Sequence, residues 1–133
     1  MMARDLLESI MSRCTVVVVE DEPLVRLTAI SMFEEAGINV VEFANGDDAI
    51  DYVRDHQQDV AAIFTDVYLP GETDGLELAG IVSEACPDIA VLVTSGNLRD
   101  KPTQLGPQVR YVSKPWLPHD VLNTMQAAVR AAA

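Results

Sequence analysis

Apolar residues occur along the chain in five short runs, each followed at once by polar or acidic residues. The runs span Val16 to Val19, Ile38 to Ala44, Val60 to Phe64, Ile89 to Val93 and Val109 to Val112. Runs of this length, rich in β-branched residues, are typical of strands that are buried on both faces of a sheet. The pattern therefore predicts five strands.

Segments with apolar residues at helical spacing separate these runs. We expect helices over residues 23–37, from about 46 to 54, over 76–82 and from about 119 to 130. Pro23 opens the first helix and Gly37 closes it, the positions that these two residue types favour. The cluster from Asn45 to Asp48 supplies a turn and a capping residue for the second helix.

The segment between the fourth and fifth runs departs from this rhythm. Pro102, Gly106 and Pro107 leave little room for regular turns, so we expect a short or irregular helix there. Elsewhere, strands that alternate with helical spacers predict right-handed crossovers and a parallel sheet covered on both faces. The expected fold class is an α/β domain with a doubly wound, five-stranded parallel sheet.

The first 13 residues stand apart from the alternating pattern. Leu6, Leu7, Ile10 and Met11 have helical spacing, which predicts an additional amphipathic helix in an extension over residues 1–13. The polar face of this segment is not basic, so packing on the domain is favoured over a role at a membrane surface.

Charge and cysteine content limit the classes of partner and compartment. The 133 residues include 21 Asp and Glu against 9 Lys and Arg, and the net charge of −12 disfavours attraction to a nucleic acid backbone. Asp5 and Glu8 interrupt any signal-peptide core, and no apolar run reaches transmembrane length. Cys14 and Cys86 lie in no metal-binding pattern, so we expect two reduced, buried thiols. These features predict a soluble cytoplasmic domain with no nucleic acid or membrane partner.

Polar residues that can carry chemistry follow four of the five predicted strands. They are Glu20, Asp21 and Glu22 after the first, Asp66 after the third, Thr94 and Ser95 after the fourth, and Lys114 after the fifth. In an open parallel sheet the ligand crevice lies outside the carboxyl ends of the strands. We therefore expect carboxylates, a hydroxyl and an ammonium to meet in one pocket.

This set of side chains predicts a magnesium site that contains a nucleophile. Carboxylates without His or Cys form a hard oxygen site, the kind that holds Mg²⁺ together with water and a phosphate. A bound cation offsets the repulsion among the carboxylates and leaves Asp66 able to attack phosphorus, which forms an acyl phosphate. Lys114 is expected to pair with phosphoryl oxygens, and the Thr94 hydroxyl to hydrogen-bond another of them.

Four motifs together resemble those of a known family. Between residues 16 and 116 the sequence contains, in this order, VVVVEDEPLVR, TDVYLPGETDGLELA, VLVTSGN and YVSKPW. They resemble the CheY-like receiver domain of response regulators, over residues 14–133. The resemblance implies a flavodoxin-like (βα)5 fold and a phospho-accepting receiver of a two-component system or phosphorelay.

The resemblance also implies a role for individual residues. Asp66 matches the aspartate that takes a phosphoryl group from a phosphohistidine of a sensor histidine kinase or a histidine phosphotransfer protein. Glu20, Asp21 and Asp66 match the Mg²⁺ ligands, and Tyr68 is expected to add its main-chain carbonyl.

Further residues match the switch of the family. Thr94 matches the hydroxyl that moves toward the phosphoryl group, Tyr111 the aromatic that swings inward, and Lys114 the lysine before a proline that can be cis. Movement of these side chains is expected to change a protein-interaction surface. The expected supporting residues are Glu22, Ser95 and Pro115.

Two segments depart from the usual family pattern. Asp66 to Asp74 spans eight positions where the commoner loop spans seven, so the LPGETDG segment carries one extra residue. The broken helix after the fourth strand lies in a region that often forms the output or dimer face in the family, which leaves a homodimer open. No output domain follows the last predicted helix, so the chain resembles a stand-alone receiver with an unknown downstream protein partner and is not expected to be a turnover enzyme.

Two other functions stay open at this point. A receiver-like interaction module could keep the fold and lose phosphorylation, although all the expected site positions hold suitable residues. A magnesium-dependent phosphohydrolase could also use an aspartyl phosphate. That chemistry usually needs an aspartate two residues after the nucleophile as general acid, and Tyr68 occupies this position.

Overall fold

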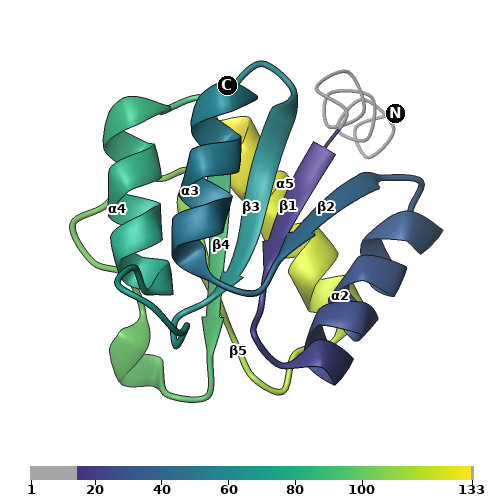
Figure 1. Cartoon of the computed structure of the whole chain (residues 1–133). Helices are drawn as coiled ribbons and strands as arrows, with labels where there is room; N and C mark the ends of the chain where they lie inside the picture. Colours follow the sequence, from purple (N-terminus) through teal and green to yellow (C-terminus); the bar gives the residue numbers. More distant parts are fainter. Residues whose placement is uncertain (1–14, 133) are drawn as a thin grey trace.

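Five strands form one parallel sheet in the order β2-β1-β3-β4-β5 (Figure 1). The computed structural model describes residues 15–132. The strands are β1 (Thr15–Val19), β2 (Asn39–Phe43), β3 (Val60–Asp66), β4 (Ala90–Ser95) and β5 (Val109–Ser113). The strand order reverses at β1, so a crevice opens between the carboxyl ends of β1 and β3. The expected doubly wound α/β fold is confirmed.

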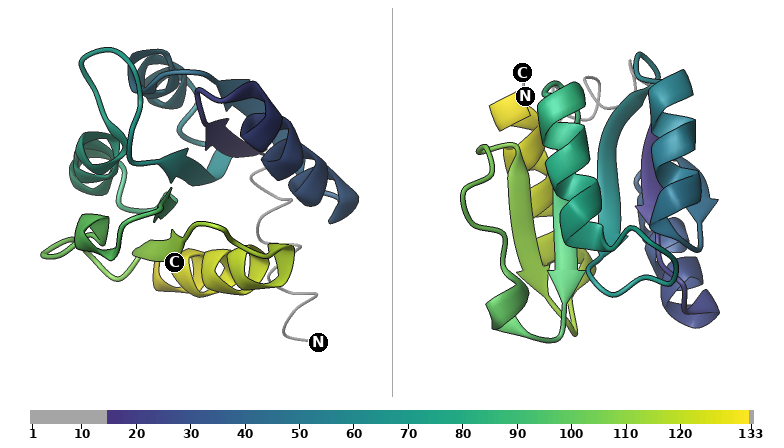
Figure 2. Two further views of the ribbon diagram at one scale, coloured as in Figure 1. Left: turned by 90° about the horizontal axis from the view of Figure 1, so that it is seen from below. Right: turned by 60° about the vertical axis from the view of Figure 1, so that its left-hand side comes forward.

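Helices cover both faces of this sheet (Figure 2). They are α2 (Pro23–Glu35), α3 (Gly46–Asp55), α4 (Gly75–Ala85) and α5 (Pro118–Ala132). The α2 and α5 helices lie on one face, and α3 and α4 lie on the other. Between β4 and β5 the chain forms only the 3-10 turn η1 (Leu98–Asp100), as the prolines and the glycine of this segment predict. The predicted helix within residues 1–13 lies outside the described residues.

The two faces of β1 build two separate hydrophobic layers. Val16 and Val18 pack toward α2 and α5, whereas Val17 and Val19 pack toward α3 and α4. All four side chains are almost completely buried, because successive residues of a strand point to opposite faces and both faces are covered. Each buried valine of this kind contributes about 1.5 kcal/mol or more to the burial free energy.

Two strands run further than their apolar residues predict. β3 includes Asp66 and β4 includes Ser95, because main-chain pairing continues through the polar residues. In this register Asp66 lies opposite Thr94, and Thr94 lies opposite Val112. The strand ends are therefore set by pairing with neighbours, and the pairing places Asp66 and Thr94 side by side.

Capping residues set where the helices near the crevice begin. Asn45 caps α3 as predicted, since its side-chain oxygen accepts a hydrogen bond from the Asp48 amide at 2.8 Å. Asp74 and Glu77 form a reciprocal capping box at the start of α4, which the sequence analysis did not identify. This box ends the loop that follows Asp66.

Within residues 15–132 no helix is long and apolar enough to cross a membrane. Cys86 is buried and free, as expected, and Cys14 lies outside the described residues.

Candidate functional site

Three carboxylates meet in the crevice at the carboxyl ends of β1 and β3. Glu20, Asp21 and Asp66 each offer one oxygen, and these oxygens lie within 4.8 Å of one another. Glu20 and Asp66 are 4% and 8% exposed, whereas Asp21 is open to solvent. The fold thus brings Asp66 together with Glu20 and Asp21, which lie at least 45 positions earlier in the sequence.

A single ammonium group links two of these carboxylates. Lys114 Nζ lies 2.9 Å from Glu20 Oε1 and 2.8 Å from Asp66 Oδ2. Lys114 follows β5, and its main-chain amide donates to the Ser95 carbonyl at 2.7 Å, which holds the end of β5 beside β4. The peptide bond between Lys114 and Pro115 is cis, the form that the resemblance allowed.

Burial and charge change the ionisation of this cluster. Burial raises the pKa of Glu20, and the nearby charge of Asp66 adds to this, against the lowering effect of the Lys114 hydrogen bond. Burial lowers the pKa of the Lys114 ammonium, but hydrogen bonds and charge attraction from Asp66 and Glu20 outweigh it, so the pKa is raised overall. The ammonium therefore stays charged and offsets part of the repulsion between the two acids.

The donor set suits a hard divalent cation. Three carboxylate oxygens converge without a His or Cys among them, which is the chemistry that Mg²⁺ prefers. The Tyr68 main-chain amide lies 3.4 Å from Asp66 Oδ1, so the main chain of Tyr68 borders the same cluster. Glu20, Asp21 and Asp66 therefore fit the predicted ion.

Thr94 and Tyr111 lie on neighbouring strands beside the cluster. The Thr94 side chain is buried, and its hydroxyl has no hydrogen-bond partner among residues 15–132. The Tyr111 hydroxyl lies 3.0 Å from both the Oγ and the carbonyl of Ser95 and 3.2 Å from the Asn97 carbonyl. Thr94 thus has a free hydroxyl next to Asp66, while Tyr111 binds the turn that follows β4.

Two of the expected supporting residues make local hydrogen bonds beside the cluster. Glu22 contributes its main-chain amide, which donates to Glu20 Oε2 at 3.2 Å, while its side chain is exposed and outside the carboxylate cluster. The Ser95 hydroxyl donates to the Asn97 carbonyl at 2.9 Å, so Ser95 stabilises the turn that follows β4. Glu22 is the N-cap residue of α2 and Ser95 is the last residue of β4, so both lie where an element begins or ends and hydrogen-bond locally.

The loop after Asp66 is tied to the start of α3. Asp47 accepts hydrogen bonds from the Glu72 amide at 3.2 Å and from the Thr73 hydroxyl at 2.6 Å. Gly71 has φ +92°, and a Cβ at this position would lie 2.6 Å from Asp47 Oδ2. Asp47 therefore accommodates the extra residue of the loop, a role that sequence reasoning missed because its partners lie about 25 positions away.

Gly75 is the second residue of the site that sequence reasoning missed. Its amide donates to the Val67 carbonyl at 2.8 Å, and a Cβ at Gly75 would collide with the main-chain carbonyl of Asp66. Only a residue without a side chain lets α4 begin this close to the phosphoacceptor candidate. In the sequence Gly75 directly follows Asp74, and nothing local indicates this contact.

Comparison with known proteins identifies the family. The sequence model of the response regulator receiver domain matches residues 16–126. The chain belongs to this family. It is therefore a phospho-accepting signalling receiver of the two-component type.

Both a short receiver protein and part of a larger protein are similar in sequence to this chain. The response regulator receiver protein CpdR of Brucella abortus is 29% identical over 120 residues, which cover 88% of this chain and 98% of CpdR. A protein-glutamate methylesterase/protein-glutamine glutaminase of Natronomonas pharaonis is 39% identical over 85 residues, 63% of this chain, but the match spans only 23% of that protein. The crystal structure of a response regulator receiver protein from Sinorhizobium medicae superposes with a TM-score of 0.80 at 18% identity, covering 90% of this chain and 96% of that one.

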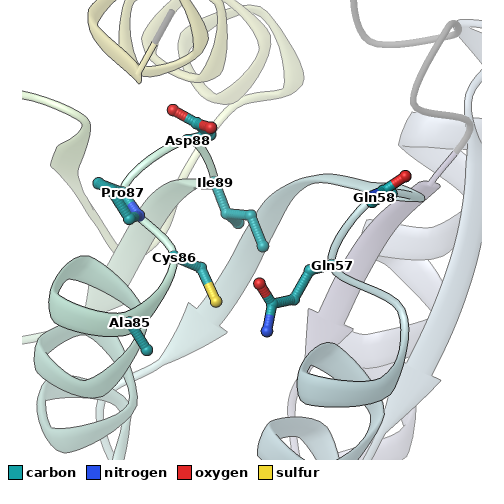
Figure 3. Close-up of a pocket in the computed structure, with 7 residues that line it drawn as sticks. All are labelled: Gln57, Gln58, Ala85, Cys86, Pro87, Asp88 and Ile89. Carbon is teal, nitrogen blue, oxygen red and sulfur yellow. The ribbon is translucent and has the colours of Figure 1, made fainter.

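A separate pocket lies at the amino ends of β3 and β4, whereas the carboxylate cluster lies at the carboxyl ends of the strands (Figure 3). It has a volume of about 480 Å³ and lies between the turns that precede β3 and β4. Cys86 and Gln57 point toward one another across it. Burial raises the pKa of the Cys86 thiol, so this pocket holds no activated nucleophile.

Proposed function

We propose that Asp66 is the residue of this receiver that accepts the phosphoryl group. One carboxylate oxygen attacks phosphorus, the P–N bond to the donor imidazole breaks, and the electron pair returns to the imidazole nitrogen. The observation that carries this assignment is the position of Asp66, which contacts Lys114 and shares the crevice with Glu20 and Asp21.

We assign the remaining charged groups to binding and orientation. Lys114 is free to exchange its ion pair with Asp66 for one with a phosphoryl oxygen, because its stem is flexible and its charge is retained. Glu20, Asp21 and Asp66, with the main-chain carbonyl of Tyr68, are the proposed Mg²⁺ ligands. When bound, this ion supplies positive charge that offsets the negative charge of the phosphoryl oxygens.

We propose that Thr94 and Tyr111 convert phosphorylation into a changed surface. A phosphoryl oxygen gives the buried Thr94 hydroxyl the partner that it lacks among the described residues. Movement of Thr94 shifts the adjoining turn at Ser95 and Asn97, to which the Tyr111 hydroxyl is bound. A change in this turn therefore reaches β5 and the exposed segment before it.

The proposed donor is a phosphohistidine on a sensor histidine kinase or a histidine phosphotransfer protein. The sensor kinase CckA of Brucella abortus is 33% identical over 86 residues, 65% of this chain and 9% of that protein, which supports a link to such kinases. The receiver accepts the group once and passes the signal on by binding a downstream protein, without acting as a turnover enzyme.

Exposed leucines of α2 and of the turn before α5 support the docking of such a donor. The exposed fractions of Leu24, Leu27 and Leu117 are 74%, 58% and 65%. A cavity of about 380 Å³ between α2 and the turn before α5 is lined by Val25, Thr28, Lys114, Pro115 and Trp116. Because Lys114 borders both this cavity and Asp66, a donor seated on this surface has its imidazole next to the acceptor.

Intact mass measurement tests the assignment of Asp66. The protein is incubated with Mg²⁺ and acetyl phosphate, and Asp66→Asn and a chelator serve as controls. We expect an increment of one phosphoryl group that is absent in both controls. Asp51→Asn, on the exposed face of α3, is the matched variant and is expected to be phosphorylated normally.

Other outcomes of this experiment favour the alternatives. Continuous release of phosphate without an adduct would support the phosphohydrolase. Mg²⁺ binding without adduct or phosphate release would support an interaction module. An adduct that persists in Asp66→Asn would show that another residue is the acceptor.

A further inference from the structure

Tyr68 joins two loops that flank the carboxylate cluster. Its hydroxyl donates a hydrogen bond to Asp100 Oδ1 at 3.0 Å, although 61% of the residue is exposed. Tyr68 belongs to the loop between β3 and α4, whereas Asp100 is the last residue of the η1 turn, 32 positions later. The hydrogen bond therefore ties the loop that borders Asp66 to the segment between β4 and β5.

Main-chain hydrogen bonds hold the residue that precedes Tyr68. The Val67 amide donates to the Thr94 carbonyl at 3.0 Å, and the Val67 carbonyl accepts from Gly75 at 2.8 Å. By contrast, the hydrogen bond that the Tyr68 amide makes among residues 15–132 is the long 3.4 Å contact with Asp66 Oδ1. The Tyr68 amide is thus held less tightly than the Val67 amide and carbonyl.

Asp100 lies in a turn that several hydrogen bonds stabilise. Its amide donates to the Asn97 carbonyl at 2.9 Å, and the same carbonyl accepts from the hydroxyls of Ser95 and Tyr111. The second carboxylate oxygen of Asp100 is buried and has no partner within residues 15–132. Tyr68 is therefore the one side-chain partner that orients this carboxylate in the described part of the chain.

We propose that Asp100 is a positioning residue for the metal site and acts through the Tyr68 hydroxyl. The Tyr68–Asp100 hydrogen bond holds the Tyr68 peptide where its carbonyl is available to Mg²⁺. Loss of this bond leaves the three carboxylates in place. Mg²⁺ affinity then falls, because the loop loses conformational entropy when the ion binds. This inference rests on the proposed function, because it uses the same Mg²⁺ site.

A double-mutant cycle on Mg²⁺ affinity tests the proposal. The variants are Tyr68→Phe, Asp100→Ala and the double variant, with Mg²⁺ binding followed by calorimetry. We expect each single variant to bind Mg²⁺ about threefold to tenfold more weakly, the range that one hydrogen bond supplies. The double variant is expected to be no weaker than the singles, because both remove the same bond.

Two further comparisons separate the hydrogen bond from charge and from general damage. Asp100→Asn keeps an oxygen acceptor but loses the negative charge, and we expect its Mg²⁺ affinity to stay within about twofold of wild type. Tyr52→Phe and Asp55→Ala change the same residue types away from the loop and are expected to leave the affinity unchanged. In metal-free protein, amide hydrogen exchange of residues 98–101 is expected to be faster in Tyr68→Phe than in wild type.

The proposal can fail in ways that differ from failure of the proposed function. If the wild-type protein binds Mg²⁺ but the two single substitutions weaken binding additively, or do not weaken it, only the role of Asp100 is overturned. An Asp100→Asn variant as weak as Asp100→Ala would show that charge and not the hydrogen bond is responsible. No Mg²⁺ binding by the wild-type protein would overturn both the positioning role and the proposed metal site.

Discussion

The Lys114 ammonium lies 2.8 Å from Asp66 Oδ2 and so joins the ends of two strands that are separated by β4. The same ammonium contacts Glu20 at 2.9 Å. Two largely buried acids therefore share one cation. This arrangement holds the crevice together and places the cation where a phosphoryl group is expected.

Replacing Lys114 with Met is expected to destabilise the receiver. Two buried carboxylates lose their cation, and we expect the free energy of unfolding at pH 7 to fall by about 1–3 kcal/mol, discounted for the 26% exposure of the Lys114 side chain. Urea denaturation measures this change, and Lys101→Met at an exposed position is the matched control.

The effect of Lys114→Met is expected to depend on pH in a defined direction. Because the pKa of Lys114 is raised above its ordinary 10.5, the stabilisation by its charge is complete below pH 10.5 and is lost only above that. The pKa of Glu20 is raised above 4.5, so acidification toward pH 4.5 neutralises Glu20 and reduces the need for the ammonium. The deficit should therefore be smaller at pH 4.5 than at pH 7, and an equal deficit at both would contradict this.

Gly75→Ala and Gly80→Ala are expected to have opposite effects. At Gly75 the new Cβ meets the Asp66 carbonyl, and we expect a loss of about 2 kcal/mol or more together with weaker phosphorylation. At Gly80, in the same helix, nothing lies within 4 Å of the new Cβ, and alanine should stabilise by about 0.5–1 kcal/mol. Thermal unfolding of both variants checks the pair. Equal changes in stability would show that contact with the Asp66 carbonyl does not determine the effect of Gly75→Ala.

Leu27→Glu is expected to separate protein donors from small donors. The new charge lies on the exposed face of α2. There it should reduce phosphoryl transfer from a cognate phosphohistidine protein by about tenfold. Phosphorylation by acetyl phosphate should be unchanged, because the carboxylate cluster is untouched. Ile81→Glu, at an exposed position of α4 on the other face, is the control. A similar loss in the control would indicate a general charge effect.

Cys86 is expected to resist alkylation in the folded protein. Burial raises the pKa of its thiol above 9.0, against a smaller lowering effect of Arg54, so little thiolate exists at pH 8. Peptide mapping after brief iodoacetamide treatment should find Cys86 unmodified in native protein and modified in urea. Rapid native labelling at pH 7 would contradict the burial.

The sequence by itself determined the elements and most of the site. β-branched runs and helical spacing are local signals, so they identified five strands and the helices between them. Polar residues directly after each apolar run were also a local signal. Parallel topology then required Glu20, Asp21, Asp66 and Lys114 to meet, since the carboxyl ends of all strands share one edge.

Only the tertiary structure decided which side chains support this cluster. Ser95 hydrogen-bonds within the turn that follows β4, and Asp47, Gly75 and Asp100 have partners that no local pattern indicated. The physical reason is that these contacts depend on how segments approach one another in space: the partners of Asp47 and Asp100 lie about 25 to 32 positions away, and Gly75 meets the Asp66 carbonyl across the loop between β3 and α4. Such distances arise only when the strands have paired and the loops have closed over the edge of the sheet.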